Sequence, residues 1–171
     1  GFDDVWVEYE PGKGRNDHYG VPLLREHMQC KWHVASGDFG YEDLTNPDFI
    51  NASTVSLLQR ALDAQRSHAP AGVGSRFRLV TNWHLRRGDP LSKMVHQRHG
   101  FLRLDRLFDG TGDGSIAGKV RKSWRDHLGV DDAQLRTLAR TLGPSTDTPS
   151  RLAWRDQPDP LPEIRGLRRA P

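Results

Sequence analysis

Cysteine is nearly absent from this 171-residue chain, which contains only one, Cys30. A single cysteine cannot form an internal disulfide, and no Cys-x-x-Cys or Cys/His array is present to hold structural zinc. Long apolar runs are absent too: none approaches the ~20 residues that cross a bilayer, and nothing resembles a signal peptide. These absences predict a soluble, cytoplasmic protein with no membrane association.

An initiator methionine is also absent, because the chain opens on GFDDVWVEYE with a strand-like alternation in its first residues. We therefore expect the first elements of the fold to lie upstream of residue 1. The length suits one domain with a hydrophobic core. A shift to Pro, Ser, Thr, Asp and Arg predicts that this domain covers residues 1–143 and that residues 144–171 form a tail or linker.

Charge of one sign is in only small excess, since the formal net charge is +3 although the pI is near 9.3. Charged residues make up 27% of the chain and hydrophobic ones 35%, a balance that can bury a core. Most of the basic residues are arginine, whose planar guanidinium suits phosphate recognition. This balance permits nucleic-acid binding without demonstrating it.

Hydrophobic periodicity predicts an α/β fold in the order strand, strand, helix, strand and three helices. A glycine-rich loop separates the first two strands, and Asn51 or Ser53 is the expected cap of the first helix. The predicted strands cover residues 5–9, 27–34 and 76–82, and the predicted helices cover residues 53–67, 90–100, 115–128 and 131–142.

The second predicted strand, HMQCKWHV, has two unequal faces. The apolar face, which we expect in the hydrophobic core, consists of Met28, Cys30, Trp32 and Val34. The polar face consists of His27, Gln29, Lys31 and His33. Glutamine and lysine prefer water and are poor strand formers, so the polar face is either an ordinary solvent-facing surface or a functional site.

Acidic residues accumulate on and beside the first predicted strand, at Asp3, Asp4, Glu8 and Glu10. Carboxylates and an amide oxygen are hard ligands suited to Mg²⁺, and a nearby lysine can orient a water molecule or stabilise a transition state. With Gln29 and Lys31 on the neighbouring strand, these acids form a candidate phosphodiesterase site. The alternative, which we favour for Glu10, is that the acids keep an exposed edge strand soluble.

Asp4 ahead of one strand and Gln29-Cys30-Lys31 in the next resemble the PD-(D/E)xK, or restriction-endonuclease-like, nuclease superfamily, in the branch where glutamine replaces the second acid. The resemblance implies a mixed sheet with flanking helices, extended here by C-terminal helices, and an endonuclease that depends on Mg²⁺ or Mn²⁺. It places Lys31 against the attacking water. The implied metal ligands are Asp4, Gln29 and the Cys30 backbone carbonyl, with Asp3 and Glu8 as alternates.

A closer resemblance, over residues 3–142, is to the N-terminal nuclease domains of bacterial antiphage effectors such as the SAVED-domain proteins of CBASS systems. It rests on DDVWVE, QCKWH, YEDL, FRLVTNWHL and DPL ahead of LxRLF. The resemblance implies an antiphage role, cleavage of double-stranded DNA and a fused C-terminal sensor or ATPase domain beyond residue 171. Assembly releases cleavage in that family, so we keep a homo-oligomer open.

Arginine-rich stretches form the candidate DNA-binding surface, since phosphate contacts supply most sequence-independent affinity. Ordinary salt-bridged surface is an equal alternative. No recognition-helix motif is present, so we expect low sequence specificity. The candidate DNA contacts are Arg76, Arg78, His84, Arg86 and Arg87.

Two further alternatives stay open. His96 and His99 have a helical spacing that permits metal binding, but we favour a solvated face for them because no third ligand is nearby in the sequence. For the whole domain, the rival function is a non-catalytic nucleic-acid-binding or assembly module of the same fold, since a fold does not establish an activity.

Overall fold

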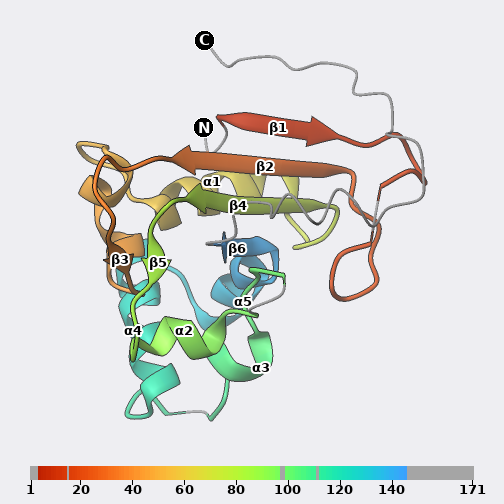
Figure 1. Cartoon of the computed structure of the whole chain (residues 1–171). Helices are drawn as coiled ribbons and strands as arrows, with labels where there is room; N and C mark the ends of the chain where they lie inside the picture. Colours follow the sequence, from red (N-terminus) through yellow and green to blue (C-terminus); the bar gives the residue numbers. More distant parts are fainter. Residues whose placement is uncertain (1–3, 15, 97–98, 111, 146–171) are drawn as a thin grey trace.

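The centre of the fold is a four-stranded mixed sheet of β1 (Val5–Glu8), β2 (Arg25–Lys31), β4 (Ser75–Thr81) and β6 (Leu142–Ser145) (Figure 1). The spatial order is β1-β2-β4-β6, with β1 antiparallel to β2 and the other three strands parallel. The computed structural model describes residues 4–14, 16–96, 99–110 and 112–145. Helices flank this sheet, so the expected α/β class with a mixed sheet is confirmed.

The three predicted strands are present with shifted ends. β2 begins two residues before the predicted range and ends at Lys31, so residues 32–34 lie beyond it. β6 was not predicted, because Gly143 and Pro144 weaken a strand pattern. Since β6 continues to Ser145, the predicted domain boundary at residue 143 falls within a strand, and the rest of the predicted tail lies outside the described residues.

A second sheet consists of two very short parallel strands, β3 (Asp38–Phe39) and β5 (His84–Leu85). Strands of two residues show no hydrophobic period, so neither was predicted. Figure 1 shows this sheet at the end toward which β2 and β4 point. The segments that follow β2 and β4 therefore run side by side at that end of the molecule.

The helix α1 (Leu57–His68) crosses one face of the main sheet (Figure 1). Its N-cap is Ser56 rather than Asn51 or Ser53. Ser56 and Gln59 form a capping box, in which each side chain accepts a hydrogen bond from the other residue's backbone N–H. Two 3₁₀-helices precede it, η1 (Asp43–Thr45) and η2 (Pro47–Ile50).

Two of the C-terminal helices were predicted correctly, α4 (Ile116–Leu128) and α5 (Asp132–Thr141). Ser115 and Asp131 cap their N-termini by accepting hydrogen bonds from backbone N–H groups of the first turn. No helix of the described residues combines the length and the apolar character needed to cross a membrane.

The helix predicted over residues 90–100 is shorter, because α2 (Pro90–Met94) ends where Val95 forms an antiparallel bridge with Leu102. The chain has left the helical conformation at that point, and a side-chain pattern alone does not reveal such a bridge. The single-turn helix α3 (Leu104–Leu107) follows and was not predicted.

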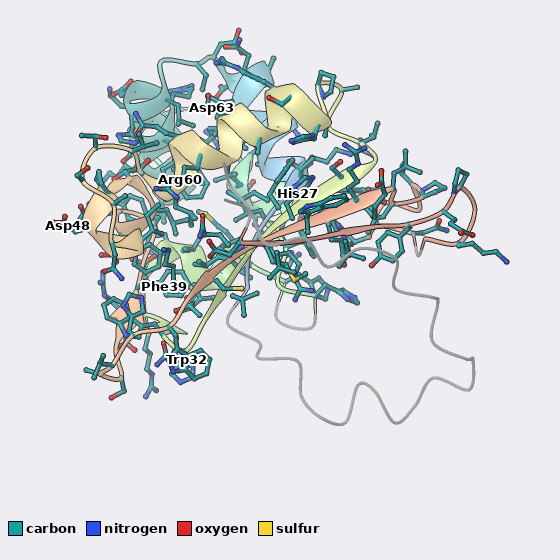
Figure 2. The ribbon with its side chains drawn as sticks, turned by 90° about the horizontal axis from the view of Figure 1, so that it is seen from above. His27, Trp32, Phe39, Asp48, Arg60 and Asp63 are labelled. Atoms are coloured by element: carbon teal, nitrogen blue, oxygen red, sulfur yellow. The ribbon has the colours of Figure 1, made fainter. Side chains whose placement is uncertain are left out.

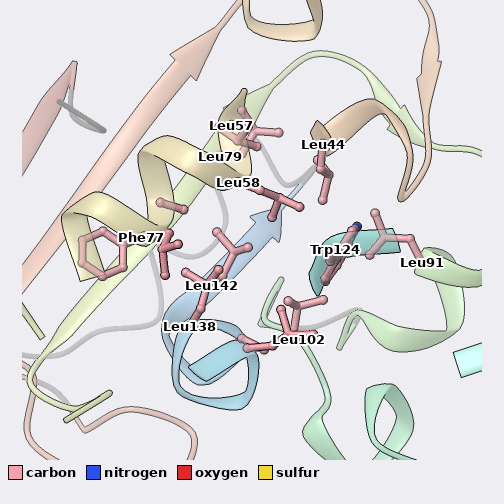
Figure 3. Close-up of a cluster of buried hydrophobic side chains, with 14 of the residues drawn as sticks. Leu44, Leu57, Leu58, Phe77, Leu79, Leu91, Leu102, Trp124, Leu138 and Leu142 are labelled. Carbon is pink, nitrogen blue, oxygen red and sulfur yellow. The ribbon is translucent and has the colours of Figure 1, made fainter. Parts of the chain in front are cut away.

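The hydrophobic core lies between α1, the parallel strands and the C-terminal helices (Figure 3). Leu58 of α1, Leu79 of β4, Leu142 of β6 and Trp124 of α4 are all buried there. The Trp124 indole N–H donates to the Tyr41 backbone carbonyl at 3.0 Å, so this large side chain is buried with its polar atom satisfied. The burial holds α1 firmly across one face of β2 and β4.

The covered face of β2 is the opposite of the predicted one. Gln29 and His27, on the face toward α1, are 1% and 3% exposed, whereas Cys30 is exposed and Trp32 is 71% exposed. The prediction that Cys30, Trp32 and Val34 lie in the core was therefore wrong. The physical reason is tertiary: α1 covers the polar face of the strand, and residues 32–34 lie past the end of the sheet.

Candidate active site

Asp4 and Gln29 meet at the edge of the sheet, where β1 begins. The Asp4 carboxylate oxygen Oδ2 accepts hydrogen bonds from Gln29 Nε2 at 2.6 Å and from the Cys30 backbone N–H at 2.8 Å. The pairing of β1 with β2 sets this contact, because the Asp4 backbone N–H donates to the Met28 carbonyl at 3.0 Å. The predicted placement of an acid beside this amide is confirmed, and both of these donors to the carboxylate are neutral groups.

Lys31 is the last residue of β2, two positions after Gln29 on the same face, and it is partly exposed. No salt bridge joins its ammonium group to an acid of the described part of the chain. A lysine without an acidic partner keeps its charge available for an anionic ligand. The predicted set of Asp4, Gln29 and Lys31 is therefore gathered at one edge, with Asp4 and Gln29 in direct contact.

Arg60 is a site residue that sequence reasoning missed. It lies on α1 (Figure 2), and its Nη1 donates to Gln29 Oε1 over a long contact of 3.5 Å. The buried Gln29 amide is thus held on both sides, by the Asp4 carboxylate and the Arg60 guanidinium. One signal was present in the sequence: Arg60 falls on the stripe of α1 that contains the buried Leu57 and Ala64.

The donors at this edge suit a divalent cation chemically. The Met28 carbonyl and the Cys30 N–H both form hydrogen bonds with Asp4. Because the N–H and C=O of one strand residue point toward the same neighbouring strand, the Cys30 carbonyl also points toward β1 and Asp4. Mg²⁺ needs only one or two protein carboxylates and fills its other positions with water and phosphate. Gln29 now gives its nitrogen to Asp4, so its oxygen would join the ligand set only after the amide turns and leaves Arg60.

The alternate metal ligands do not extend this set. Glu8 pairs with Arg25 at 2.8 Å at the other end of β1, four residues from Asp4 and therefore about 13 Å away along the strand. Glu8 is thus a structural ion-pair partner rather than an alternate ligand, and Asp3 lies outside the described residues. No cluster of three or more His, Cys, Asp or Glu side chains fit to hold a metal occurs among the described residues.

The His96 and His99 rings lie 4.6 Å apart on the surface, and both side chains are exposed. No third side chain of the described residues joins them in a metal-binding cluster. Their placement agrees with the solvated face that we favoured for them.

Of the candidate DNA contacts on β4, Arg76 is buried and Arg78 is half-buried. Arg76 is 8% exposed, its Nη1 lies 3.6 Å from Glu26 Oε1, and its guanidinium stacks over the Phe101 ring at 4.1 Å. A buried, ion-paired arginine cannot reach a phosphate, so the prediction for Arg76 was wrong. Arg78 is half-buried on the same face.

The other candidate contacts lie on the exposed segment that contains β5. His84 and Arg87 are exposed, and Arg86 is exposed but donates to Asp43 Oδ2 at 2.8 Å. Because this segment follows β4, it lies at the same end of the sheet as Lys31. Of the candidate DNA contacts, the exposed ones at this end of the sheet are therefore His84, Arg86 and Arg87 rather than the arginines of β4.

The pKa values of Cys30 and His33, which lie on either side of Lys31 in the sequence, are both shifted by their surroundings. Burial and the Asp4 charge raise the pKa of the Cys30 thiol, so Cys30 stays a neutral thiol and is a poor nucleophile at neutral pH. Burial and the Lys31 charge lower the pKa of His33, which favours the neutral imidazole. Neither Cys30 nor His33 therefore adds a charge beside Asp4 and Lys31 at neutral pH.

The chain is similar to CD-NTase-associated protein 4 of Enterobacter hormaechei subsp. hoffmannii (strain UCI 50), with 38% identity over 168 residues. The alignment covers 97% of this chain and 33% of the relative, so the chain spans about a third of the length of the curated relative it matches. No protein-family model matches the chain.

Proposed function

We propose that this chain is a nuclease domain that hydrolyses phosphodiester bonds of double-stranded DNA, with Mg²⁺ or Mn²⁺ and with low sequence preference. The observation that carries the proposal is the 2.6 Å contact between Asp4 and Gln29, two residues from Lys31 on the same strand face. A carboxylate, an amide and a lysine with no acidic partner among the described residues are suitable parts for metal-assisted phosphodiester hydrolysis.

Each residue has a distinct role in this proposal. Asp4 and the Cys30 carbonyl hold the cation, and the Gln29 oxygen joins them once its amide turns. The cation, when bound, supplies Lewis-acid polarisation of the phosphate and lowers the pKa of a bound water. Lys31 orients the attacking water and offsets charge that develops on the phosphate. Arg60, released from Gln29, binds a phosphate oxygen with its planar guanidinium.

The similarity to CD-NTase-associated protein 4 supports an antiphage role, as part of a CBASS system, for the protein that contains this chain. Because the chain spans about a third of that relative, a fused sensor or ATPase domain and a homo-oligomeric assembly that releases cleavage are also proposals. A cytoplasmic location belongs to the same proposal, since phage DNA is attacked inside the cell.

A non-catalytic module that binds nucleic acid or supports assembly is the second candidate. One observation favours it: Asp4 is the acid that contacts Gln29, and no cluster of three or more His, Cys, Asp or Glu side chains fit to hold a metal occurs among the described residues. A single carboxylate is the minimum for a Mg²⁺ site, and such a site depends on water and the substrate phosphate for its other ligands.

Plasmid cleavage by the full-length protein separates these two functions. The reaction is followed with Mg²⁺ and with EDTA, each with and without a panel of cyclic oligonucleotides as activators. Lys31→Ala is expected to reduce the cleavage rate about a hundredfold or more while DNA affinity changes much less, because its contribution is made in the transition state. Lys119→Ala, an exposed lysine of α4, is the matched control and should cleave normally.

Two results would remove the enzymatic proposal. One is a plasmid left intact by the full-length protein under every activating condition. The other is Lys31→Ala cleaving as fast as the Lys119→Ala control. Binding of DNA without cleavage would instead favour the non-catalytic module.

A further inference from the structure

Residues 32–34, here called the Trp32 tip, expose apolar side chains directly after the candidate lysine. Trp32 is 71% exposed and Val34 is fully exposed. Figure 2 shows Trp32 on the side of the sheet away from α1 and Arg60. Single exposed apolar residues are ordinary, but two at alternate positions of one segment form a small apolar surface.

The Trp32 tip is held rigidly from its inner side. The Asn82 amide bonds both backbone groups of His33: its Oδ1 accepts from the His33 N–H and its Nδ2 donates to the His33 carbonyl, each at 2.8 Å. The His33 ring stacks on Trp83, with ring centroids 3.8 Å apart, and the Trp83 indole N–H donates to the Ala35 carbonyl at 2.8 Å. With His33 fixed inward, its neighbours Trp32 and Val34 project outward.

The charge around the tip favours a polyanion as the occupant. Lys31 precedes the tip. His84 lies beside the residues that follow the tip, where its N–H donates to the Gly37 carbonyl at 3.0 Å and it pairs with the exposed Asp38, and Arg87 lies three residues further along the same segment. Lys31 and Arg87 form no salt bridge with an acid of the described residues. An apolar wedge that directly follows a lysine, with an arginine further along the neighbouring segment, matches the combination of groove contact and phosphate contact that DNA offers.

We propose that the Trp32 tip is a DNA-contacting wedge, with Trp32 packing against bases in a groove of the duplex. The proposal rests on the proposed function for the identity of the ligand. Trp32 follows Gln29 by three residues, which is about 10 Å along a strand.

Equilibrium binding tests this proposal without relying on cleavage. The full-length protein is titrated into a fluorescein-labelled 20-base-pair duplex in EDTA, and anisotropy is followed at several salt concentrations. Trp32→Ala is expected to weaken binding about tenfold, because an aromatic contact with the bases is lost. The loss should be the same at every salt concentration, because a base contact displaces no counterions from the phosphates. Trp32→Phe keeps an aromatic face and should stay within about threefold of the parent.

Two variants serve as controls. Ile116→Ala removes an exposed apolar side chain at the start of α4 and should leave the affinity unchanged. Arg87→Ala should lower the slope of log affinity against log salt by about one, which Trp32→Ala should not do. Thermal melts that match the parent show that each variant is folded.

Each outcome decides the proposal. Equal affinities for Trp32→Ala and Ile116→Ala overturn it while leaving the nuclease proposal intact. Self-association of the parent that Trp32→Ala abolishes, with DNA affinity unchanged, also overturns it, because the tip is then an interface between copies. Absence of duplex binding by the parent overturns the wedge, and plasmid cleavage then decides the nuclease proposal separately. Trp32-dependent binding without plasmid cleavage under any condition supports the wedge and removes the nuclease.

Discussion

Acidic side chains at the two ends of β2 have different hydrogen-bond and ion-pair partners. Near the start of the strand, Glu26 lies 3.6 Å from the Arg76 guanidinium, and both side chains are buried. At its end, among the described residues, Asp4 accepts hydrogen bonds from neutral donors and Lys31 has no acidic partner. Charges that neutralise each other hold the fold together, whereas charges kept apart at an accessible edge remain available for ligands of both signs.

This difference predicts that substitutions near the start of β2 mainly change the free energy of unfolding, whereas substitutions at its end mainly change DNA cleavage. Glu26→Gln leaves the buried Arg76 guanidinium without its ion pair and should lower the free energy of unfolding by about 3 kcal/mol. Urea unfolding followed by circular dichroism measures this change. Glu8→Gln, which removes the exposed ion pair with Arg25, should cost less than about 1 kcal/mol. Equal losses for the two variants would contradict the distinction.

Arg60 provides the corresponding test at the other end. Arg60→Ala should lower the free energy of unfolding by about 1 kcal/mol, because the buried Gln29 oxygen loses a long hydrogen bond. It should lower kcat/KM for DNA cleavage about tenfold, because one charged hydrogen bond to phosphate is lost. The reduction should come mainly from a raised KM, and Arg60→Lys should restore part of it. Arg25→Ala, an arginine of the far end of β2, is the matched control. A similar loss in both variants would show that total charge, not position, matters.

Acidification should produce the smallest effect. Burial, followed by the Lys31 charge, lowers the pKa of His33 from its ordinary value of 6.5, so the unfolded chain binds more protons than the folded chain just below that value. The neutral His33 therefore makes its full contribution to stability above about pH 7, and this contribution is lost as the pH falls from 6.5 toward the lowered pKa. Melting temperatures between pH 7.5 and 5 should fall less steeply for His33→Gln than for the control His84→Gln, an exposed histidine. Parallel curves would contradict the assignment.

Much of the fold could be predicted because the signals are local. The caps and apolar spacing of α4 and α5 lie within their own residues, and the acid of one hairpin strand was expected beside the amide of the next, as Asp4 and Gln29 are. Local signals did not show which face of β2 the helix α1 covers. The core packing of α1 decides that, and it places Gln29 inside and Trp32 outside, against the hydrophobic alternation.

The parts of the site that were not predicted depend on tertiary contacts. Arg60 reaches Gln29 from a helix 31 residues further along the chain, and Arg76 is buried because Glu26 and Phe101 surround it. A run of arginines in the sequence does not reveal which of them has an internal partner. The sequence thus predicts the chemical groups of the edge, and the packing decides which of them face solvent.

Binding of Mn²⁺ to the full-length protein, followed by the loss of the free-ion signal in electron paramagnetic resonance, tests the role of the Asp4 edge most directly. Asp4→Asn should weaken Mn²⁺ binding by about tenfold or more, because the charged ligand is removed while the side chain keeps its size. Glu8→Gln, an acid already paired with Arg25, should bind Mn²⁺ as the parent does. Identical titrations for Asp4→Asn and the parent, in the presence of duplex DNA, would contradict a cation site at this edge.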